Sequence, residues 1–214
     1  MRPFSTVHTV ALAHRPSPPP SFPESPMSAS HLLTALSLLW VGYELWLRRQ
    51  RRAADGGAHD QGTLGQLWRV LSLSIAVAVG LAFAGISHWP PAWQEPLRWS
   101  ACALIAGGLG LRVWAIQVLA RWFTVDVTIQ ADHQLVRSGP YRWLRHPSYT
   151  GALLCFYGMA LGMGNALSLL VIVLPVTWVF LRRIRVEEAA LRHAFPTRYA
   201  DYATQSWRLL PLVW

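Results

Sequence analysis

The amino-acid sequence predicts an all-α integral membrane protein with five transmembrane helices and a cytosolic, helical C-terminal cap. Only 14% of the 214 residues are charged, against about 25% in an average soluble domain. The chain is 53% hydrophobic and contains twelve tryptophans, a residue type that concentrates at membrane–water boundaries. Its apolar residues gather into long runs. This composition excludes intrinsic disorder and an ordinary soluble domain.

The apolar runs define the predicted spans. A transmembrane helix needs about 20 mostly apolar residues to cross a hydrocarbon core of about 30 Å. The second run contains Gly80 and Gly85, small residues suited to close helix contact. The last two runs flank residues 162–165 and are interpreted as a helical hairpin. The five runs comprise residues 31–47, 70–87, 99–120, 149–163 and 166–181.

Composition also divides the chain. Residues 1–26 are rich in proline and typical of a disordered tail, and Met27 directly precedes the first run, so we expect the natural start at Met27. Residues 27–120 hold the first three helices, and residues 121–214 hold the last two helices with the polar segments. The two cysteines both fall within spans and indicate neither a disulfide framework nor a metal site.

The net charge is +9, and every basic residue that contributes to it is an arginine. The positions of these arginines indicate what the charge does. A basic chain first suggests nucleic-acid binding. If the first helix ends inside the cell, fifteen of the nineteen arginines fall on the inner side. Arginines in short loops face the cytoplasm, so we predict an external N-terminus, a cytoplasmic C-terminus, contact with anionic lipid and no nucleic-acid partner. The lack of lysine suggests a GC-rich bacterial genome and therefore a bacterial inner membrane.

Arg112 is the exception, because it lies within the third span. An ionisable residue inside a span is a functional candidate by default. It lies nine residues before Arg121, which is roughly 13 Å along a helix. The alternative is that its side chain extends to the inner surface beside Glu44.

The first polar segment, residues 121–148, predicts a turn followed by a helix start. Gly139 and Pro140 favour a turn. Pro147 disfavours helical geometry at His146 and then suits the first turn of the following span. We therefore expect His146 at a helix entrance, where free backbone N–H groups face the inner surface. The alternative is an interfacial turn whose arginines contact lipid phosphates.

The second polar segment, residues 182–214, begins with three arginines and the adjacent carboxylates of Glu187 and Glu188. A solvated charge cluster is common on a helix surface. The functional alternative is a carboxylate that binds a cation or ribose hydroxyls. A site built from the two polar segments would lie between membrane and cytosol, which suits a lipophilic substrate and a water-soluble cofactor.

Together the two segments resemble a known family. Residues 135–151 read Leu-Val-x-x-Gly-x-Tyr-x-x-x-Arg-His-Pro-x-Tyr-x-Gly, and residues 187–202 read Glu-Glu-x-x-Leu-x-x-x-Phe-x-x-x-Tyr-x-x-Tyr, followed by Arg-x-x-Pro at 208–211. This combination resembles the isoprenylcysteine carboxyl methyltransferase family, which is related to phospholipid methyltransferases, over roughly the half of the chain from Trp122. Pro196 is a departure, because a glycine commonly follows the phenylalanine, and it concerns the local turn.

The resemblance implies an integral membrane enzyme that takes a methyl group from S-adenosylmethionine and releases S-adenosylhomocysteine. It places Arg183 against a substrate carboxylate, with Arg145 as a second candidate for the chemistry, and makes Glu187 the cofactor-contacting member of the glutamate pair. The cofactor-binding residues that it implies are His133, Gln134, Leu135, Val136, Tyr141, His146, Pro147, Ser148, Tyr149, Glu187 and Glu188.

These residue types are suited to a methyl-transfer reaction. It is an in-line displacement that depends on alignment. A carboxylate acceptor is already ionised at pH 7, and an arginine fork can hold it in bidentate geometry. We expect a lipophilic or lipidated substrate that presents an isoprenylcysteine-like carboxylate or another small acid, thiol or amine.

Two alternatives stay open from the sequence. Membrane sterol and enone reductases share a similar Arg-His-Pro-x-Tyr block but use NADPH. The adjacent glutamates and the stretch at residues 133–136 favour the methyltransferase. The second alternative is a non-catalytic membrane protein, such as a small transporter or an assembly factor. The clustering of polar residues on one face argues against transport.

Overall fold

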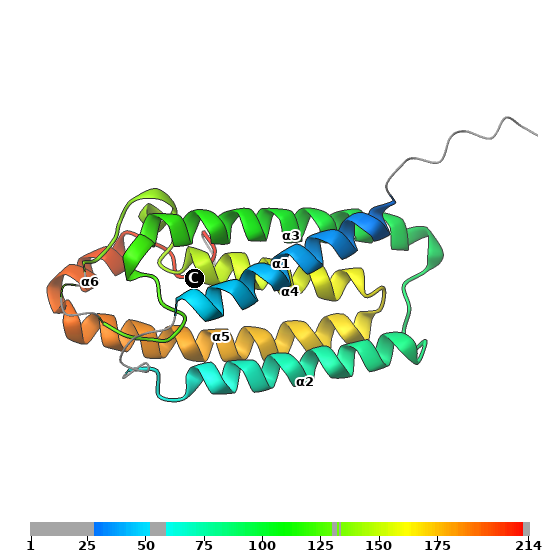
Figure 1. Cartoon of the computed structure of the whole chain (residues 1–214), viewed down its shortest axis with the longest axis horizontal. Helices are drawn as coiled ribbons and strands as arrows, with labels where there is room; N and C mark the ends of the chain where they lie inside the picture. The colour runs from blue at the N-terminus through cyan, green and yellow to red at the C-terminus, as the bar shows by residue number, and fades with distance from the viewer. Residues whose placement is uncertain (1–27, 52–58, 130–131, 133, 212–214) are drawn as a thin grey trace, which may run out of the picture.

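The computed structural model describes residues 28–51, 59–129, 132 and 134–211. The predicted tail and start, residues 1–27, lie outside this part. Within the described part the protein is all-helical, and five α-helices run along a bundle with a sixth at one end (Figure 1). The α-helices are α1 (Ala29–Gln50), α2 (Thr63–Phe83), α3 (Pro91–Leu119), α4 (Pro147–Gly162), α5 (Ala166–Ala194) and α6 (Pro196–Thr204), and the short 3-10 helices are η1 (Ala120–Trp122) and η2 (Gly139–Arg142).

Local sequence sets the ends of α4 and α5. Pro147 occupies the first turn of α4, where its missing N–H costs no hydrogen bond. Asn165 caps α5, because its side chain accepts a hydrogen bond from the Ser168 amide at 2.7 Å. Only three residues separate the end of α4 at Gly162 from the start of α5 at Ala166. The predicted helical hairpin is therefore present.

Helix α5 is longer than the predicted span at residues 166–181, because the helix continues beyond its apolar part. The apolar run ends at Leu181, whereas the helix ends at Ala194. Residues 182–194 are rich in arginine, glutamate, alanine and leucine, which favour helix, and contain no glycine or proline to end it. The adjacent glutamates are thus carried on a rigid extension of an apolar helix, which fixes the directions of their side chains.

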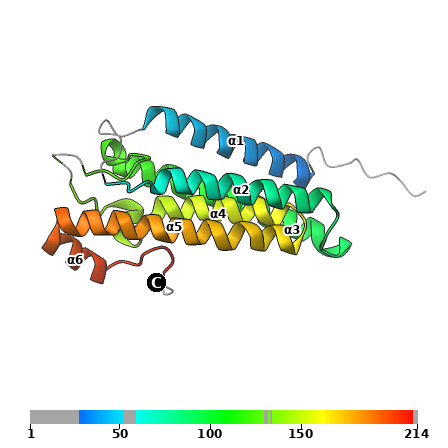
Figure 2. The ribbon, with the colours of Figure 1, turned by 90° about the horizontal axis from the view of Figure 1, so that it is seen from below.

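Two helix pairs, α3 with α4 and α2 with α5, hold the bundle together. Glycines bring α3 and α4 close: a Cβ atom on Gly151 would lie 2.5 Å from the Gly108 carbonyl oxygen. The prediction that Gly80 and Gly85 mediate close contact is wrong, since a Cβ atom on either would meet open space. Helix α1 packs mainly on α3 and lies along the edge of the bundle (Figure 2).

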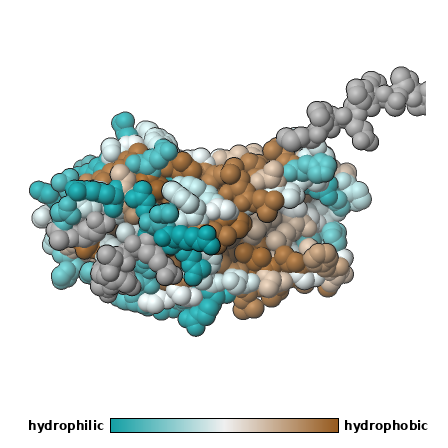
Figure 3. All heavy atoms as spheres, in the orientation of Figure 1, coloured by the Kyte–Doolittle hydropathy of each residue, from teal (hydrophilic) through white to brown (hydrophobic). Residues whose placement is uncertain are grey.

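Among the described residues, three helical stretches are long and apolar enough to cross a membrane: α2, α3 together with η1, and α5. Helix α4 has only 16 residues, and neither it nor α1 is among the three. Large apolar side chains such as Leu73, Phe83 and Leu174 are exposed on the bundle, and hydrophilic surface gathers around the end that carries α6 (Figure 3). The protein is thus an all-helical membrane protein, and the five-span topology stays a prediction.

The segment after α6 folds back against the turn before α4. The Arg145 amide donates to the Trp207 carbonyl at 2.7 Å, and the Trp207 amide donates to the Trp143 carbonyl at 2.9 Å. The Thr150 hydroxyl donates to the Leu209 carbonyl at 2.8 Å. These bonds hold the C-terminal segment against the start of α4.

Candidate active site

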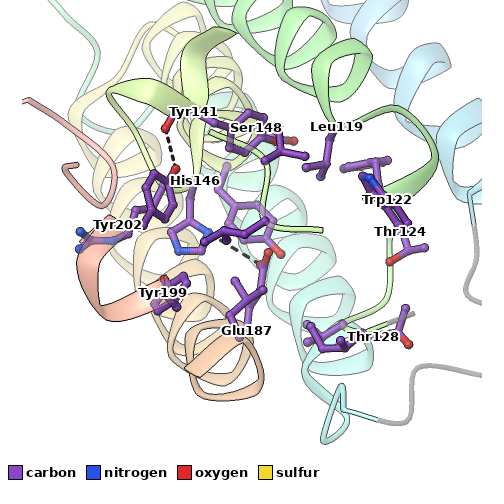
Figure 4. Close-up of a pocket in the computed structure, with 18 of the residues that line it drawn as sticks. Leu119, Trp122, Thr124, Thr128, Tyr141, His146, Ser148, Glu187, Tyr199 and Tyr202 are labelled. Atoms are coloured by element: carbon purple, nitrogen blue, oxygen red, sulfur yellow. Dashed lines mark hydrogen bonds and ion pairs between the residues drawn. The ribbon is translucent and has the colours of Figure 1, made fainter. Parts of the chain in front are cut away.

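A pocket opens at the end of the bundle where α4 begins (Figure 4). It is a concave pocket that is partly open to solvent, and small-molecule and cofactor sites are typically concave. Its walls come from the stretch after α3, η2, the first turn of α4, the polar part of α5, and α6. The predicted site residues that line it are Leu135, Val136, Tyr141, Arg145, His146, Ser148, Tyr149 and Glu187.

Of the other predicted site residues, the described ones, Gln134, Pro147, Arg183 and Glu188, do not line this pocket. His133 lies outside the described residues. Gln134 is exposed to solvent, and Pro147 is buried. Glu188 and Arg183 are both almost fully buried and form ion pairs with other protein groups.

Glu187 and Glu188 are neighbours in sequence with opposite surroundings. Glu188 is 1% exposed and accepts hydrogen bonds from the guanidinium groups of Arg145, Arg192 and Arg208 at 3.0–3.1 Å. It holds the C-terminal segment to α5 instead of contacting the pocket. Glu187 points into the pocket (Figure 4), and its buried Oε2 has no hydrogen-bond partner among the described residues.

His146 lies between the two glutamates and is 4% exposed. Its Nε2 is 3.4 Å from Glu188 Oε1, and its Nδ1 is 3.8 Å from Glu187 Oε2. Its ring stacks on Tyr149 with a centroid distance of 5.7 Å. The imidazole therefore joins the first turn of α4 to α5, which supports a positioning role and not proton transfer.

Arg145 lines the pocket but directs its hydrogen bonds away from it. Its Nε donates to Glu188 Oε1 at 3.1 Å. Its Nη1 donates to the Ala203 carbonyl at 2.7 Å and to the Ser206 carbonyl. These hydrogen bonds anchor α6 and the residues after it, and the role of Arg145 in the chemistry stays a prediction.

Four tyrosines line the pocket, and Tyr141, Tyr199 and Tyr202 are those outside the long helices of the bundle. Burial, with the nearby charge of a glutamate, raises the pKa of Tyr141 and of Tyr199. Burial raises the pKa of Tyr202 to about 12, and its hydroxyl donates to the Tyr141 carbonyl at 2.6 Å. Tyr141, Tyr199 and Tyr202 are thus neutral at physiological pH.

Arg183 lies beside Tyr149 and is 2% exposed. Its Nη1 donates to Asp60 Oδ1 at 2.7 Å and to Thr63 Oγ1 at 2.9 Å, its Nε donates to the Tyr149 hydroxyl at 3.1 Å, and its Nη2 donates to the Val125 carbonyl. Burial disfavours the Asp60 carboxylate, but a backbone amide and Arg183 outweigh that effect and lower its pKa. The arginine predicted to bind a substrate carboxylate thus already has a carboxylate partner within the chain.

A second cavity, also partly open, lies among α1, α2, α4 and α5. Its lining is mostly leucine, tryptophan, phenylalanine and other apolar side chains. Phe123, Thr124 and Tyr149 line both this apolar cavity and the first pocket, so they form a common wall. The charged residues of the apolar cavity are Glu44, Arg112 and Arg183.

Sequence reasoning missed two parts of the site. The stretch at residues 122–129 supplies much of the pocket lining but carries no motif. Asp60 precedes α2, and its side chain accepts hydrogen bonds from the Thr63 hydroxyl and the Leu64 amide. An aspartate shortly before an apolar run is a helix-start signal, but that signal does not reveal the pairing with Arg183 across the bundle.

Comparisons with known proteins identify the class. The family model described as phospholipid methyltransferase matches residues 97–198. Protein-S-isoprenylcysteine O-methyltransferase B of Arabidopsis thaliana is 34% identical over 147 residues, which cover 67% of this chain and 72% of that protein. The corresponding enzyme of Saccharomyces cerevisiae is 33% identical over 114 residues, which cover 52% of this chain and 48% of the yeast protein.

A solved structure has the same fold. The eukaryotic intramembrane Ras methyltransferase isoprenylcysteine carboxyl methyltransferase superposes with a TM-score of 0.64 at 20% identity, covering 89% of this chain and 70% of that one. The helical bundle, its two adjoining cavities and the sequence matches define a membrane methyltransferase. Within that class, the chain belongs to the protein-S-isoprenylcysteine O-methyltransferase family.

Proposed function

We propose that this protein transfers a methyl group from S-adenosylmethionine, bound in the pocket at the start of α4, to a lipophilic acceptor bound in the apolar cavity. One observation carries the proposal: Phe123, Thr124 and Tyr149 form a wall common to the two cavities. Methyl transfer requires a donor and an acceptor aligned at near contact. Two adjoining cavities, one polar and one apolar, allow a water-soluble donor and a lipid acceptor to meet in this way.

The pocket residues fit a cofactor that carries a positive charge and hydroxyl groups. When bound, S-adenosylmethionine supplies an activated methyl group on a sulfonium sulfur. A buried carboxylate oxygen without a hydrogen-bond partner is costly unless a ligand satisfies it, and Glu187 Oε2 is such an atom. It can accept hydrogen bonds from ribose hydroxyls or offset the sulfonium charge.

The apolar cavity fits an acceptor with a long hydrocarbon chain, because burying apolar surface contributes about 25 cal/mol per Å². We propose an isoprenylcysteine-like carboxylate as the acceptor. Such a group is ionised at pH 7 and needs no strong base. Arg183 has five N–H groups, of which protein atoms engage four, and the fifth can orient the acceptor.

The family assignment disfavours the two alternatives considered from the sequence. The matched relatives are named as methyltransferases, so neither an NADPH-dependent reductase nor a non-catalytic membrane protein is supported. For the membrane placement we propose five spans in a bacterial inner membrane, with α1 and α4 crossing beside α2, α3 and α5. In this arrangement the N-terminus is external, and the pocket faces the cytoplasm, where the cofactor is found.

Calorimetry on detergent-solubilised protein tests the cofactor. We expect S-adenosylhomocysteine to bind and NADPH to give no binding heat. Labelled S-adenosylmethionine offered with N-acetyl-S-farnesylcysteine, a prenyl thiol and a lipophilic amine then tests the acceptor. We expect label in the farnesylcysteine, and label only in the thiol or the amine would replace the proposed acceptor. Binding of NADPH alone would overturn the proposed function.

A further inference from the structure

Arg112 on α3 is paired inside the protein and does not extend to the surface. It is 8% exposed. Its Nε and Nη2 donate to the two carboxylate oxygens of Glu44 on α1, the second at 2.7 Å. Trp40 Nε1 donates to the same carboxylate at 3.2 Å. The expected neighbour, Glu44, is confirmed, but the alternative of a side chain reaching the inner surface is wrong.

The remaining hydrogen bonds of Arg112 reach the first turn of α4. Its Nη1 donates to the Ser148 carbonyl at 3.1 Å and to the Ser148 hydroxyl at 2.9 Å. A planar guanidinium can contact a carboxylate along one edge and a backbone turn along another, whereas a lysine ammonium is a point charge. One side chain therefore joins α1, α3 and α4.

The same turn of α4 has little freedom to move against α3. A Cβ atom on Gly151 would lie 2.5 Å from the Gly108 carbonyl oxygen and 2.8 Å from the Arg112 amide nitrogen. Backbone contact thus sets the separation of the two helices at this level. The hydrogen bonds from Arg112 to Ser148 add an angular restraint, because they fix which way the first turn of α4 faces.

A small rotation of the first turn of α4 would move Ser148 and Tyr149 relative to the two cavities. Ser148 lines the cofactor pocket, and Tyr149 lines both cavities. The Tyr149 hydroxyl accepts a hydrogen bond from Arg183 at 3.1 Å. The first turn of α4 is therefore held on one side by Arg112 and on the other by Arg183. A displacement of about 1 Å between reacting groups can cost on the order of 100-fold in rate.

We propose that Glu44 and Arg112 are positioning residues for methyl transfer, which orient the first turn of α4 so that Ser148 and Tyr149 hold donor and acceptor in line. The inference rests on the proposed function. It extends the site to α1 and to the middle of α3, outside the segments that carry the family motifs. Arg112 acts through Ser148, and Glu44 acts by orienting and neutralising Arg112.

Arg112→Lys tests the positioning role directly. The variant keeps a positive charge opposite Glu44 but loses the planar fork that reaches Ser148. We expect the Kd of S-adenosylhomocysteine to rise and kcat to fall, each by about tenfold, as for loss of hydrogen bonds from a charged group. The KM of the lipophilic acceptor should change less than kcat, because Arg112 is one of the residues that line the apolar cavity. Arg98→Lys is the matched control, because Arg98 lies on the same helix with an exposed partner.

A double variant provides a second test if Arg112→Lys folds poorly. Glu44→Leu combined with Arg112→Met removes both charges, and hydrophobic replacement of a buried ion pair generally preserves folding. We expect the same losses of affinity and kcat with the Tm retained.

Wild-type affinity and kcat in either folded variant would overturn the inference. A rise confined to the KM of the acceptor would also overturn it, because the pair would then be a substrate contact. Loss of the folded protein in both variants would make the pair a purely structural requirement, with the same consequence. If the wild-type protein bound no S-adenosylhomocysteine, the proposed function itself would fail, which is a distinct outcome.

Discussion

Glu187 and Glu188 differ because a helix turns successive side chains by roughly 100°. That rotation directs Glu188 toward the C-terminal segment, where arginines surround it, and directs Glu187 toward the pocket. The motif predicts the pair and favours Glu187 as the residue that faces the cofactor. It does not reveal the anchoring role of Glu188, because Arg145 and Arg208 come from separate segments of the chain.

Substituting Glu188 should therefore lower the stability of the protein, whereas substituting Glu187 should weaken binding of the cofactor. Glu188→Gln leaves Arg145 and Arg208 without their buried counter-charge, and removing one partner of a buried pair costs about 3–5 kcal/mol. Glu187→Gln leaves no buried charge unpaired and should retain the Tm while weakening S-adenosylhomocysteine binding. Thermal unfolding and calorimetry in detergent measure both effects. Equal losses of Tm in the two variants would contradict the assignment, and Glu95→Gln at an exposed site is the control.

At the scale of the elements, the start of α4 at Pro147 and the position of the hairpin were predicted correctly. The close helix contact expected at Gly80 and Gly85 was not, and the end of an apolar run did not mark a helix end. The end of the apolar run at Leu181 is no helix end, because hydropathy falls there while helix propensity stays high. Apolar patterns report the surroundings of a helix and not where its backbone stops. A proline alone does not mark an end either, since Pro96 and Pro175 lie inside α3 and α5.

The close contact between α3 and α4 can be tested by substituting Gly151. Gly151→Ala places a methyl group 2.5 Å from the Gly108 carbonyl oxygen, and since that atom is backbone the helices must separate. Overpacking of this kind costs about 1–3 kcal/mol, and we expect a lower Tm together with weaker S-adenosylhomocysteine binding. Gly107→Ala is the control, because a Cβ atom there meets open space. A Tm for Gly151→Ala equal to that of the control would refute this view of the contact.

At the scale of the molecule, the sequence predicted an all-helical membrane protein and gathered most of the pocket residues into one region. It offered Glu44 as a neighbour of Arg112, which the structure confirms, but it could not predict that Asp60 binds the buried Arg183. The second pair joins residues 123 positions apart. A single acidic residue in a motif-free region carries no signal of its partner, so only the fold reveals this pair.

The arginine distribution leads to a prediction about orientation. Arg48, Arg121 and Arg145 lie at helix ends on the side of the pocket, whereas Arg98 lies near the start of α3 at the opposite end. Because arginine-rich ends face the cytoplasm, the pocket end and the C-terminus should be cytoplasmic.

Alkaline phosphatase, which is active only outside the cytoplasm, tests this orientation in a bacterial host. We expect a fusion after Pro211 to be inactive and a fusion after Pro90, in the connection between α2 and α3, to be active. A fluorescent protein that folds only in the cytoplasm should give the reverse pattern at the same two positions, which controls for poor expression. High phosphatase activity after Pro211 would invert the topology, and it would also place the pocket away from the cytoplasmic cofactor that the proposed function requires.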